Sequence, residues 1–227
     1  KIGVYVYARL FVATFSLPQG WSTAVAAVAC TSAIVSALAA LVESDLKRII
    51  AYSTVSQIGF IFFGLATGGE FGLAGALLYI LMHGLAKAGL FLCAGIVEQN
   101  TKTKDIDSLG GLIHTMPVTA CAFLCCAFSV MGIPPFGGFF SKYMVFMGAV
   151  KQGQPVITAA FLCGAFLTVM YLLRVYAKVF LGEARIKAKE GSAVMVASVA
   201  LLALFSLAGG ILVQYPLQCI QAALQQI

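Results

Sequence analysis

Seven basic residues lie inside stretches of the sequence that are otherwise apolar, and no Asp or Glu accompanies them there. They are Lys1, Arg9, His83, Lys87, Lys142, Arg174 and Lys178. A charged side chain at the centre of a bilayer costs at least about 2.5–3.5 kcal/mol. A lysine withdrawn from water loses part of its preference for the charged form, so it can gain or release a proton near neutral pH. A row of such groups joined by water could pass protons along.

Lys87 is the deepest of these groups, with mostly apolar residues for about ten positions on either side. His83 precedes it by one helical turn, so both side chains lie on one face of a helix. A lone buried histidine is usually a core residue with its hydrogen bonds satisfied. A histidine and a lysine on one face at membrane depth are better interpreted as a proton relay.

Lys142 follows an interruption that contains Pro134 and Pro135 and is flanked by glycines. Prolines remove backbone donors, and unsatisfied backbone at membrane depth is tolerated only inside protein or beside a water-filled cavity. Broken helices are a common construction of ion paths in transporters. The pattern therefore predicts a proton path at Lys142. The alternatives are a kink without function and a lysine that anchors the chain at the outer interface.

For the remaining basic residues, the sequence gives weaker support to a role in proton transport. Lys178 and Arg174 lie near one end of their apolar stretch, where a long side chain can extend to the polar interface. Arg9 is ambiguous for the same reason. For these three residues a structural role is at least as good an interpretation as a role in transport.

The composition indicates which elements must position these groups. Hydrophobic residues form 61% of the 227-residue chain, charged residues form 10%, and the mean hydropathy is +1.00. Soluble domains have about 25% charged residues. The chain is long enough for about seven spans of roughly 20 residues. We predict an all-α, polytopic transmembrane bundle whose helices cover 1–15, 21–42, 49–67, 71–97, 116–150 with a break near Pro134 and Pro135, 155–181 and 192–214.

The loops differ strongly in charge. Those after 21–42, 71–97 and 155–181 carry Lys47, Arg48, Lys102, Lys104, Arg185, Lys187 and Lys189, whereas the other loops carry only Lys151. Short basic loops stay in the cytoplasm. This pattern, rather than nucleic-acid binding, accounts for the net charge of +6. It predicts that the tail 215–227 lies outside, where this mildly amphipathic segment would rest on the surface or dock on a neighbour.

The sequence offers no cofactor or metal site. Its seven cysteines lie almost entirely within apolar stretches, without a histidine or carboxylate at metal-ligand spacing, and are expected to be buried free thiols. Nothing in the chain is expected to bind flavin, haem or an iron–sulfur cluster. The chain opens at Lys1 directly into an apolar run, so we expect it to be the C-terminal part of a longer protein.

Four segments carry a family resemblance. Residues 45–59, DLKRIIAYSTVSQIG, resemble a signature of the antiporter-like subunits shared by respiratory complex I, Mrp antiporters and membrane-bound hydrogenases. Residues 82–92, MHGLAKAGLFL, resemble the family's helix with a histidine and a lysine. Residues 137–142, GGFFSK, resemble its segment on a broken helix. The region from Lys1 to Arg9 is similar to the family helix that carries a central lysine.

The resemblance implies the last seven of fourteen helices. By resemblance, Lys1, His83 and Lys87 match central proton-relay positions, Lys142 matches the terminal lysine of the outward half-channel, and Asp45 and Lys47 match supporting charged positions. The family's earlier glutamate–lysine pair would lie upstream of Lys1. We expect residues 1–182 to form the proton-translocating domain and 183–227 to add the final transmembrane helix and the amphipathic tail.

The function implied by the resemblance is proton translocation as a subunit of a redox-driven complex, of the NADH:quinone oxidoreductase or membrane-bound hydrogenase type. Redox chemistry would belong to other subunits. The alternatives are a subunit of an Mrp-type sodium/proton antiporter and a membrane scaffold that conducts nothing. Sodium favours clustered oxygen ligands, so spans without acids favour protons. Expected partners are other membrane subunits, lipid and protons or sodium, without nucleic acid, in a prokaryotic plasma membrane.

Overall fold

The computed structural model describes residues 1–15, 18–186 and 188–225, so Lys187, one of the predicted loop cations, lies outside the described residues. The helices are α1 (Ile2–Tyr7), the π-helical η1 (Ala8–Val12), α2 (Gln19–Val42), α3 (Leu46–Thr67), α4 (Gly69–Thr101), the 3₁₀ turn η2 (Leu112–His114), α5 (Pro117–Met131), α6 (Gly137–Lys151), α7 (Pro155–Phe180), α8 (Ala193–Ile211) and α9 (Gln214–Leu224). Across these described ranges the chain forms no strand, only an isolated bridge between Asp45 and Asp105. The prediction of an all-α fold is confirmed.

Five helices are long and apolar enough to cross a membrane. They comprise Gly20–Val42, Leu46–Thr67, Gly69–Thr101, Pro155–Phe180 and Ala193–Ile211. In lipid a helix satisfies its own backbone polar groups, which explains why so apolar a sequence folds this way. In the structure, the other two predicted spans are not single continuous α-helices. The predicted helix over 1–15 is a short helix, Ile2–Val12, whose second half is π-helical, and the predicted span over 116–150 consists of α5 and α6.

The predicted break between the two halves of that span is confirmed. Helix α5 ends at Met131, and Gly132 follows with a φ of 83°, a left-handed conformation that glycine adopts without strain. Helix α6 starts at Gly137, beyond the two prolines. The five-residue interruption leaves the last carbonyls of α5 without partners in their own helix.

Among the helix boundaries that differ from the prediction, the start of α3 and the end of α4 are explained by local capping. Helix α3 begins at Leu46 rather than at residue 49, since the carboxylate of Asp45 accepts hydrogen bonds from the amides of Lys47 and Arg48. Helix α4 runs to Thr101 rather than to residue 97 and stops at Lys102, which has a φ of 60°.

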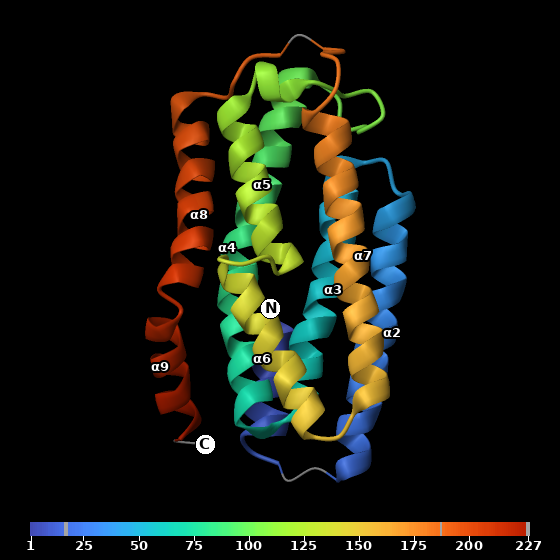
Figure 1. Cartoon of the computed structure of the whole chain (residues 1–227), viewed down its shortest axis with the longest axis vertical. Coiled ribbons are helices and arrows are strands. Elements are labelled where there is room, and N and C mark those ends of the chain that lie inside the picture. Colours follow the sequence, from blue (N-terminus) through green and yellow to red (C-terminus); the bar gives the residue numbers. More distant parts are fainter. Residues whose placement is uncertain (16–17, 187, 226–227) are drawn as a thin grey trace.

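Helices α3 and α4 form the centre of the bundle (Figure 1). Helices α2 and α7 pack on the α3 side, and α5, α6 and α8 pack on the α4 side. The core has two apolar clusters. One gathers Ile50, Leu90, Val130 and Tyr171, and the other gathers residues such as Phe60. Buried polar side chains of α3 and α4 occur between these clusters along the helices, which places a polar layer within an apolar bundle.

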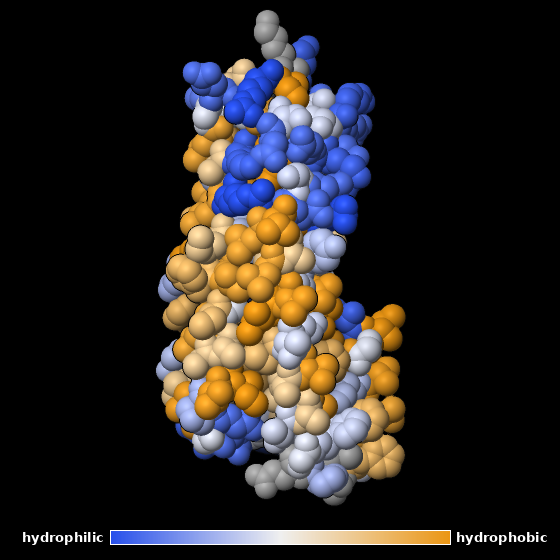
Figure 2. Space-filling model, turned by 90° about the vertical axis from the view of Figure 1, so that its right-hand side faces the viewer, coloured by the Kyte–Doolittle hydropathy of each residue, from blue (hydrophilic) through white to orange (hydrophobic). Residues whose placement is uncertain are grey.

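The two ends of the bundle differ in charge as the loop pattern predicts. The connections α2–α3, α4–α5 and α7–α8 gather at one end, at the top of Figure 1, and the connections η1–α2, α3–α4 and α6–α7 lie at the opposite end. Figure 2 shows hydrophilic residues concentrated at that first end, above a belt of hydrophobic residues. Such a belt suits a bilayer. Which end faces the cytoplasm stays a prediction.

The amphipathic tail is helical. Helix α9 follows α8 after a bend at Leu212 and packs against α4 of the same chain (Figure 1). None of its described residues is fully buried. The tail therefore docks within its own subunit along one side and leaves its other side uncovered.

Candidate proton-relay site

The histidine and the lysine predicted to share a face of α4 do so in the interior of the bundle. The side chain of Lys87 is 5% exposed and that of His83 is 1% exposed. The ammonium nitrogen of Lys87 donates to the backbone oxygen of Ile50, at 3.1 Å, and to the hydroxyl of Ser53. Both partners are neutral groups of α3. Lys87 is thus held at depth by dipoles rather than by a counter-ion.

His83 differs from the other interior polar groups in its hydrogen bonding. Neither ring nitrogen has a hydrogen-bond partner among the described residues. Buried polar groups are almost always hydrogen-bonded to protein or to ordered water. On α4, His83 lies one turn from Lys87 and one turn from Ile80, whose backbone oxygen accepts a hydrogen bond from Lys1. Its ring therefore has unused hydrogen-bonding capacity beside these basic groups.

Lys142 is held by the break between α5 and α6. Its nitrogen donates to the backbone oxygens of Val130 at 2.8 Å and Met131 at 3.4 Å, and it lies 4.6 Å from the ring centroid of Phe60. The two carbonyls belong to the last turn of α5, where the helix dipole is negative. The broken helix therefore creates the polar environment that accepts an ammonium group at depth.

This geometry bears on the alternative that Lys142 anchors the chain at the outer interface. An anchoring lysine would extend its amine toward the end of α6. The side chain is 4% exposed, and the amine instead reaches back toward α5. The kink alone does not explain such an orientation.

Lys1 contacts α4 near the histidine. Its side-chain nitrogen donates to the backbone oxygen of Ile80 at 2.9 Å. A Cβ added at Gly84 would lie 2.8 Å from that nitrogen, so the glycine leaves room for the approach. The N-terminus lies at mid-height of the bundle in Figure 1. The structure thus brings Lys1 beside the turn of α4 that carries His83.

A buried network of neutral polar groups adjoins the basic residues, and the sequence interpretation missed it. Its centre is Gln57, whose side-chain amide donates to the hydroxyls of Thr168 at 3.0 Å and Tyr171 at 3.5 Å. Gln57 accepts a hydrogen bond from the hydroxyl of Tyr79, whose ring lies 5.6 Å from that of His83. A signal was available, since Tyr79 precedes His83 by the same four-residue step that separates His83 from Lys87.

The supporting charged residues lie at the charged end of the bundle, where the connections α2–α3, α4–α5 and α7–α8 gather (Figure 1). Asp45 pairs with Lys104 at 2.8 Å, and Lys47 pairs with Glu98. Partial burial raises the pKa of Asp45, but the hydrogen bonds from Lys104 and from the amides of Arg48 and Lys47 outweigh it, so that the pKa is below its usual value. Asp45 therefore serves here as a helix cap and a link between loops.

The three ambiguous cations have structural partners or lie at the surface. Arg174 donates to the backbone oxygens of Leu41 at 2.7 Å and Glu43 at 3.0 Å, at the C-terminal end of α2. Lys178 pairs with Asp107, and Arg9 is exposed. Arg174 and Lys178 thus support the alternative in which long basic side chains extend toward the polar end.

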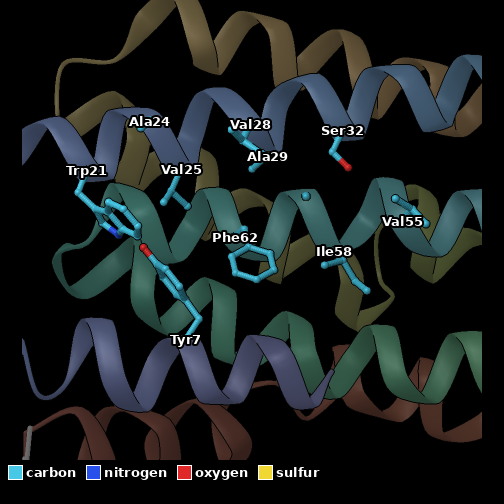
Figure 3. Close-up of a pocket in the computed structure, with 11 residues that line it drawn as sticks. Tyr7, Trp21, Ala24, Val25, Val28, Ala29, Ser32, Val55, Ile58 and Phe62 are labelled. Atoms are coloured by element: carbon cyan, nitrogen blue, oxygen red, sulfur yellow. The ribbon is translucent and has the colours of Figure 1, made fainter.

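An apolar groove of the bundle lies apart from these groups. It has a volume of about 530 Å³ between α1, α2 and α3 and is lined by residues such as Trp21, Val28 and Phe62 (Figure 3). The described residues that line it include no lysine, histidine or carboxylate. Among the described residues no group of three His, Cys, Asp or Glu side chains could hold a metal ion.

Comparison with known proteins decides the family. The sequence model of the membrane domain of the NADH:quinone oxidoreductase/Mrp antiporter family matches residues 1–168. The chain belongs to this family. It is 35% identical over 184 residues to a Na(+)/H(+) antiporter subunit of Alkalihalophilus pseudofirmus, covering 81% of this chain and 37% of that protein. It is 38% identical over 154 residues to an NADH-quinone oxidoreductase subunit of Desulforudis audaxviator, covering 68% and 31%.

Solved structures of the family have the same fold. A chain of the Mrp complex from Dietzia sp. DQ12-45-1b superposes with a TM-score of 0.93 at 25% identity, over 98% of this chain and 50% of that one. A chain of respiratory complex I from Thermus thermophilus gives 0.89 at 26% identity, over 98% and 48%. The chain thus spans half or less of the length of these relatives. The predicted family and the multi-pass membrane fold are confirmed, whereas the roles of individual residues remain predictions.

Proposed function

We propose that this chain translocates protons as an antiporter-like subunit of a redox-driven membrane complex, through a relay of Lys1, His83, Lys87 and Lys142. The observation that carries the proposal is the burial of three basic side chains without a buried acid. Among the described residues, His83, Lys87 and Lys142 are the buried ionisable groups apart from tyrosine and cysteine. A permanently charged ammonium at this depth would be costly without a counter-ion.

Such groups suit transient protonation. Lys87 and Lys142 are each bound by neutral oxygens, which can accept hydrogen bonds from an ammonium or from a neutral amine. A proton that arrives on one group disfavours a second proton nearby by Coulomb repulsion, which is stronger in a medium of low dielectric constant than in water. Charge can therefore move stepwise. We place Lys142 last, because α6 leads from the break to the end opposite the basic loops.

The proposal extends to the organisation of the subunit. Residues 1–182 would carry the relay, with Asp45 and Lys47 supporting it from the charged end, and 183–227 would complete the bundle. The partners would be other membrane subunits that supply the redox reaction, as in the multi-subunit complexes to which the relatives belong. The location would be a prokaryotic plasma membrane.

Replacement of Lys87 in the complete host complex tests this proposal. Lys87→Ala should abolish most proton pumping while the complex still assembles. Lys87→Arg should also fail, because an arginine side chain is not deprotonated in proteins. The matched control is Lys189→Ala, which removes an exposed lysine at the charged end. Wild-type pumping by Lys87→Ala would leave a non-conducting scaffold as the better interpretation.

A second candidate function is that of an Mrp-type sodium/proton antiporter subunit. The 35% identity to the Alkalihalophilus protein and the TM-score of 0.93 with the Dietzia complex favour it. Sodium uptake by inverted vesicles, driven by a pH gradient alone, would support this function. Proton pumping that requires a redox substrate and is unaffected by sodium would support the first.

A further inference from the structure

We propose that Gln57 prevents proton transfer along the buried hydroxyl groups between Lys87 and Lys142, so that protons cross this region through His83. Gln57 is here a positioning residue, and the inference rests on the proposed function. Its side chain is fully buried on α3, between the hydroxyl groups near Lys87 and the tyrosine near Lys142.

The hydroxyl groups would otherwise form a short route between the two lysines. Lys87 donates to the hydroxyl of Ser53, which also interacts with the hydroxyl of Tyr171. On the other side, the nitrogen of Lys142 lies 5.8 Å from the ring centroid of Tyr79. Gln57 contacts both tyrosine hydroxyls and is thus the link between the two sides.

A carboxamide is a poor link for protons. A hydroxyl or carboxyl group can accept one proton and release another, whereas the oxygen of an amide carries no proton and its N–H groups are too weakly acidic to release one near neutral pH. Here the amide orientation follows from its neighbours. The hydroxyl of Thr168 donates its own proton to the backbone oxygen of Gly164 at 2.9 Å, so its oxygen must accept from the nitrogen of Gln57. The oxygen of Gln57 then accepts from Tyr79.

The hydroxyl protons of Ser53 and Tyr79 are also committed to fixed acceptors. Ser53 donates to the backbone oxygen of Ile50 at 2.8 Å. Tyr79 donates to Gln57, so a proton that Tyr79 received from the Lys142 side would meet an amide oxygen that has no proton to release onward. His83 is the contrasting group, because both of its ring nitrogens lack partners among the described residues.

Blocking this shorter route has a physical consequence for coupling. A continuous chain of hydroxyls would conduct whatever the state of the redox reaction. A histidine that must be reached through water can gate the step by its ring orientation and its protonation state. Gln57 would thus prevent protons from passing between Lys87 and Lys142 through the hydroxyl groups, although both lysines lie in one polar layer.

The test combines two substitutions in the complete complex. His83→Gln removes the exchangeable ring, and proton pumping should fall by at least about tenfold. Adding Gln57→Glu supplies a carboxyl group of the same size, which accepts one proton on its carbonyl oxygen and releases another from its hydroxyl oxygen. Pumping should then recover several-fold. The matched control is Gln57→Met in the same background, which keeps the length but offers no proton site and should give no recovery.

A second measurement tests the inference without the His83→Gln substitution. Gln57→Glu alone should open a route in parallel with His83, so the pH gradient should decay faster than in wild-type vesicles after the redox substrate is exhausted. An unchanged decay, no recovery in the double variant, or equal recovery with Gln57→Met would overturn the inference. Lys87→Ala, measured in parallel, distinguishes a failure of the proposed function from a failure of the role assigned to Gln57. If it pumps normally the proposed function fails, and if it does not pump only the role of Gln57 is in question.

Discussion

Replacement of Lys142 by methionine separates the relay from a structural role most sharply. Methionine keeps the length of the side chain and removes the proton site. The backbone oxygens of Val130 and Met131 lose their donor, and an unsatisfied buried group costs about 1–3 kcal/mol. The substitution also removes a charge whose burial costs several kcal/mol. These effects have opposite signs, so we expect the free energy of unfolding to change by no more than about 2 kcal/mol.

The effect on transport should be much larger. Loss of a positioned acid–base group typically costs about 10²–10⁴-fold in rate. Since every proton would pass Lys142 in a serial relay, pumping should fall by at least about 100-fold, which corresponds to roughly 2.7 kcal/mol of barrier. Lys142→Glu should also pump poorly, because its charged form would face the carbonyl oxygens at the negative end of α5.

The assay is proton uptake by inverted vesicles under redox drive, with assembly of the complex checked on native gels. The matched control is Lys151→Met. It makes the same chemical change on the same helix, but at an exposed residue whose amine lies over the ring of Phe71. We expect near-normal pumping from it. Normal pumping by Lys142→Met would refute the assignment of Lys142 as the exit group.

Three further outcomes are expected. A single cysteine at Ser108, on a cysteine-free background, should react with impermeant reagents only from the cytoplasm, and labelling from outside would reverse the proposed orientation. Gly138→Ala should lower the melting temperature in detergent, because its Cβ would collide with the backbone oxygen of Ser129 and overpacking costs about 1–3 kcal/mol. Gly95→Ala, which meets nothing within 4 Å, should raise it slightly, and equal effects would contradict the packing argument. The lowered pKa of Asp45 means that its ionised form stabilises the fold above the unfolded-state pKa near 4, and this contribution is lost as pH falls through the lower folded-state pKa. Melting temperatures between pH 7 and pH 3 should therefore fall less steeply for Asp45→Asn, and parallel curves would show that the ionisation of Asp45 contributes nothing to stability.

The sequence by itself determined the class of the molecule and most of its elements. An apolar composition with so few charges leaves transmembrane helices as the stable solution, since the backbone must satisfy itself in lipid. The positions of Pro134 and Pro135 marked the break, and the spacing of His83 and Lys87 placed them on one face, because these features depend only on local geometry. The motifs also identified the family, which the comparisons confirmed.

Only the tertiary structure decided what surrounds each of these groups. The direction of the Lys142 side chain depends on carbonyls of another helix, and no local rule predicts that it reaches back to Val130. The network around Gln57 joins α3, α4 and α7 across 111 residues of sequence, so its partners could not be assigned from spacing. Arg174 resembled the interior lysines in sequence, yet it caps the end of α2. Burial and hydrogen bonding are properties of neighbours in space, and a single sequence specifies them only through the fold.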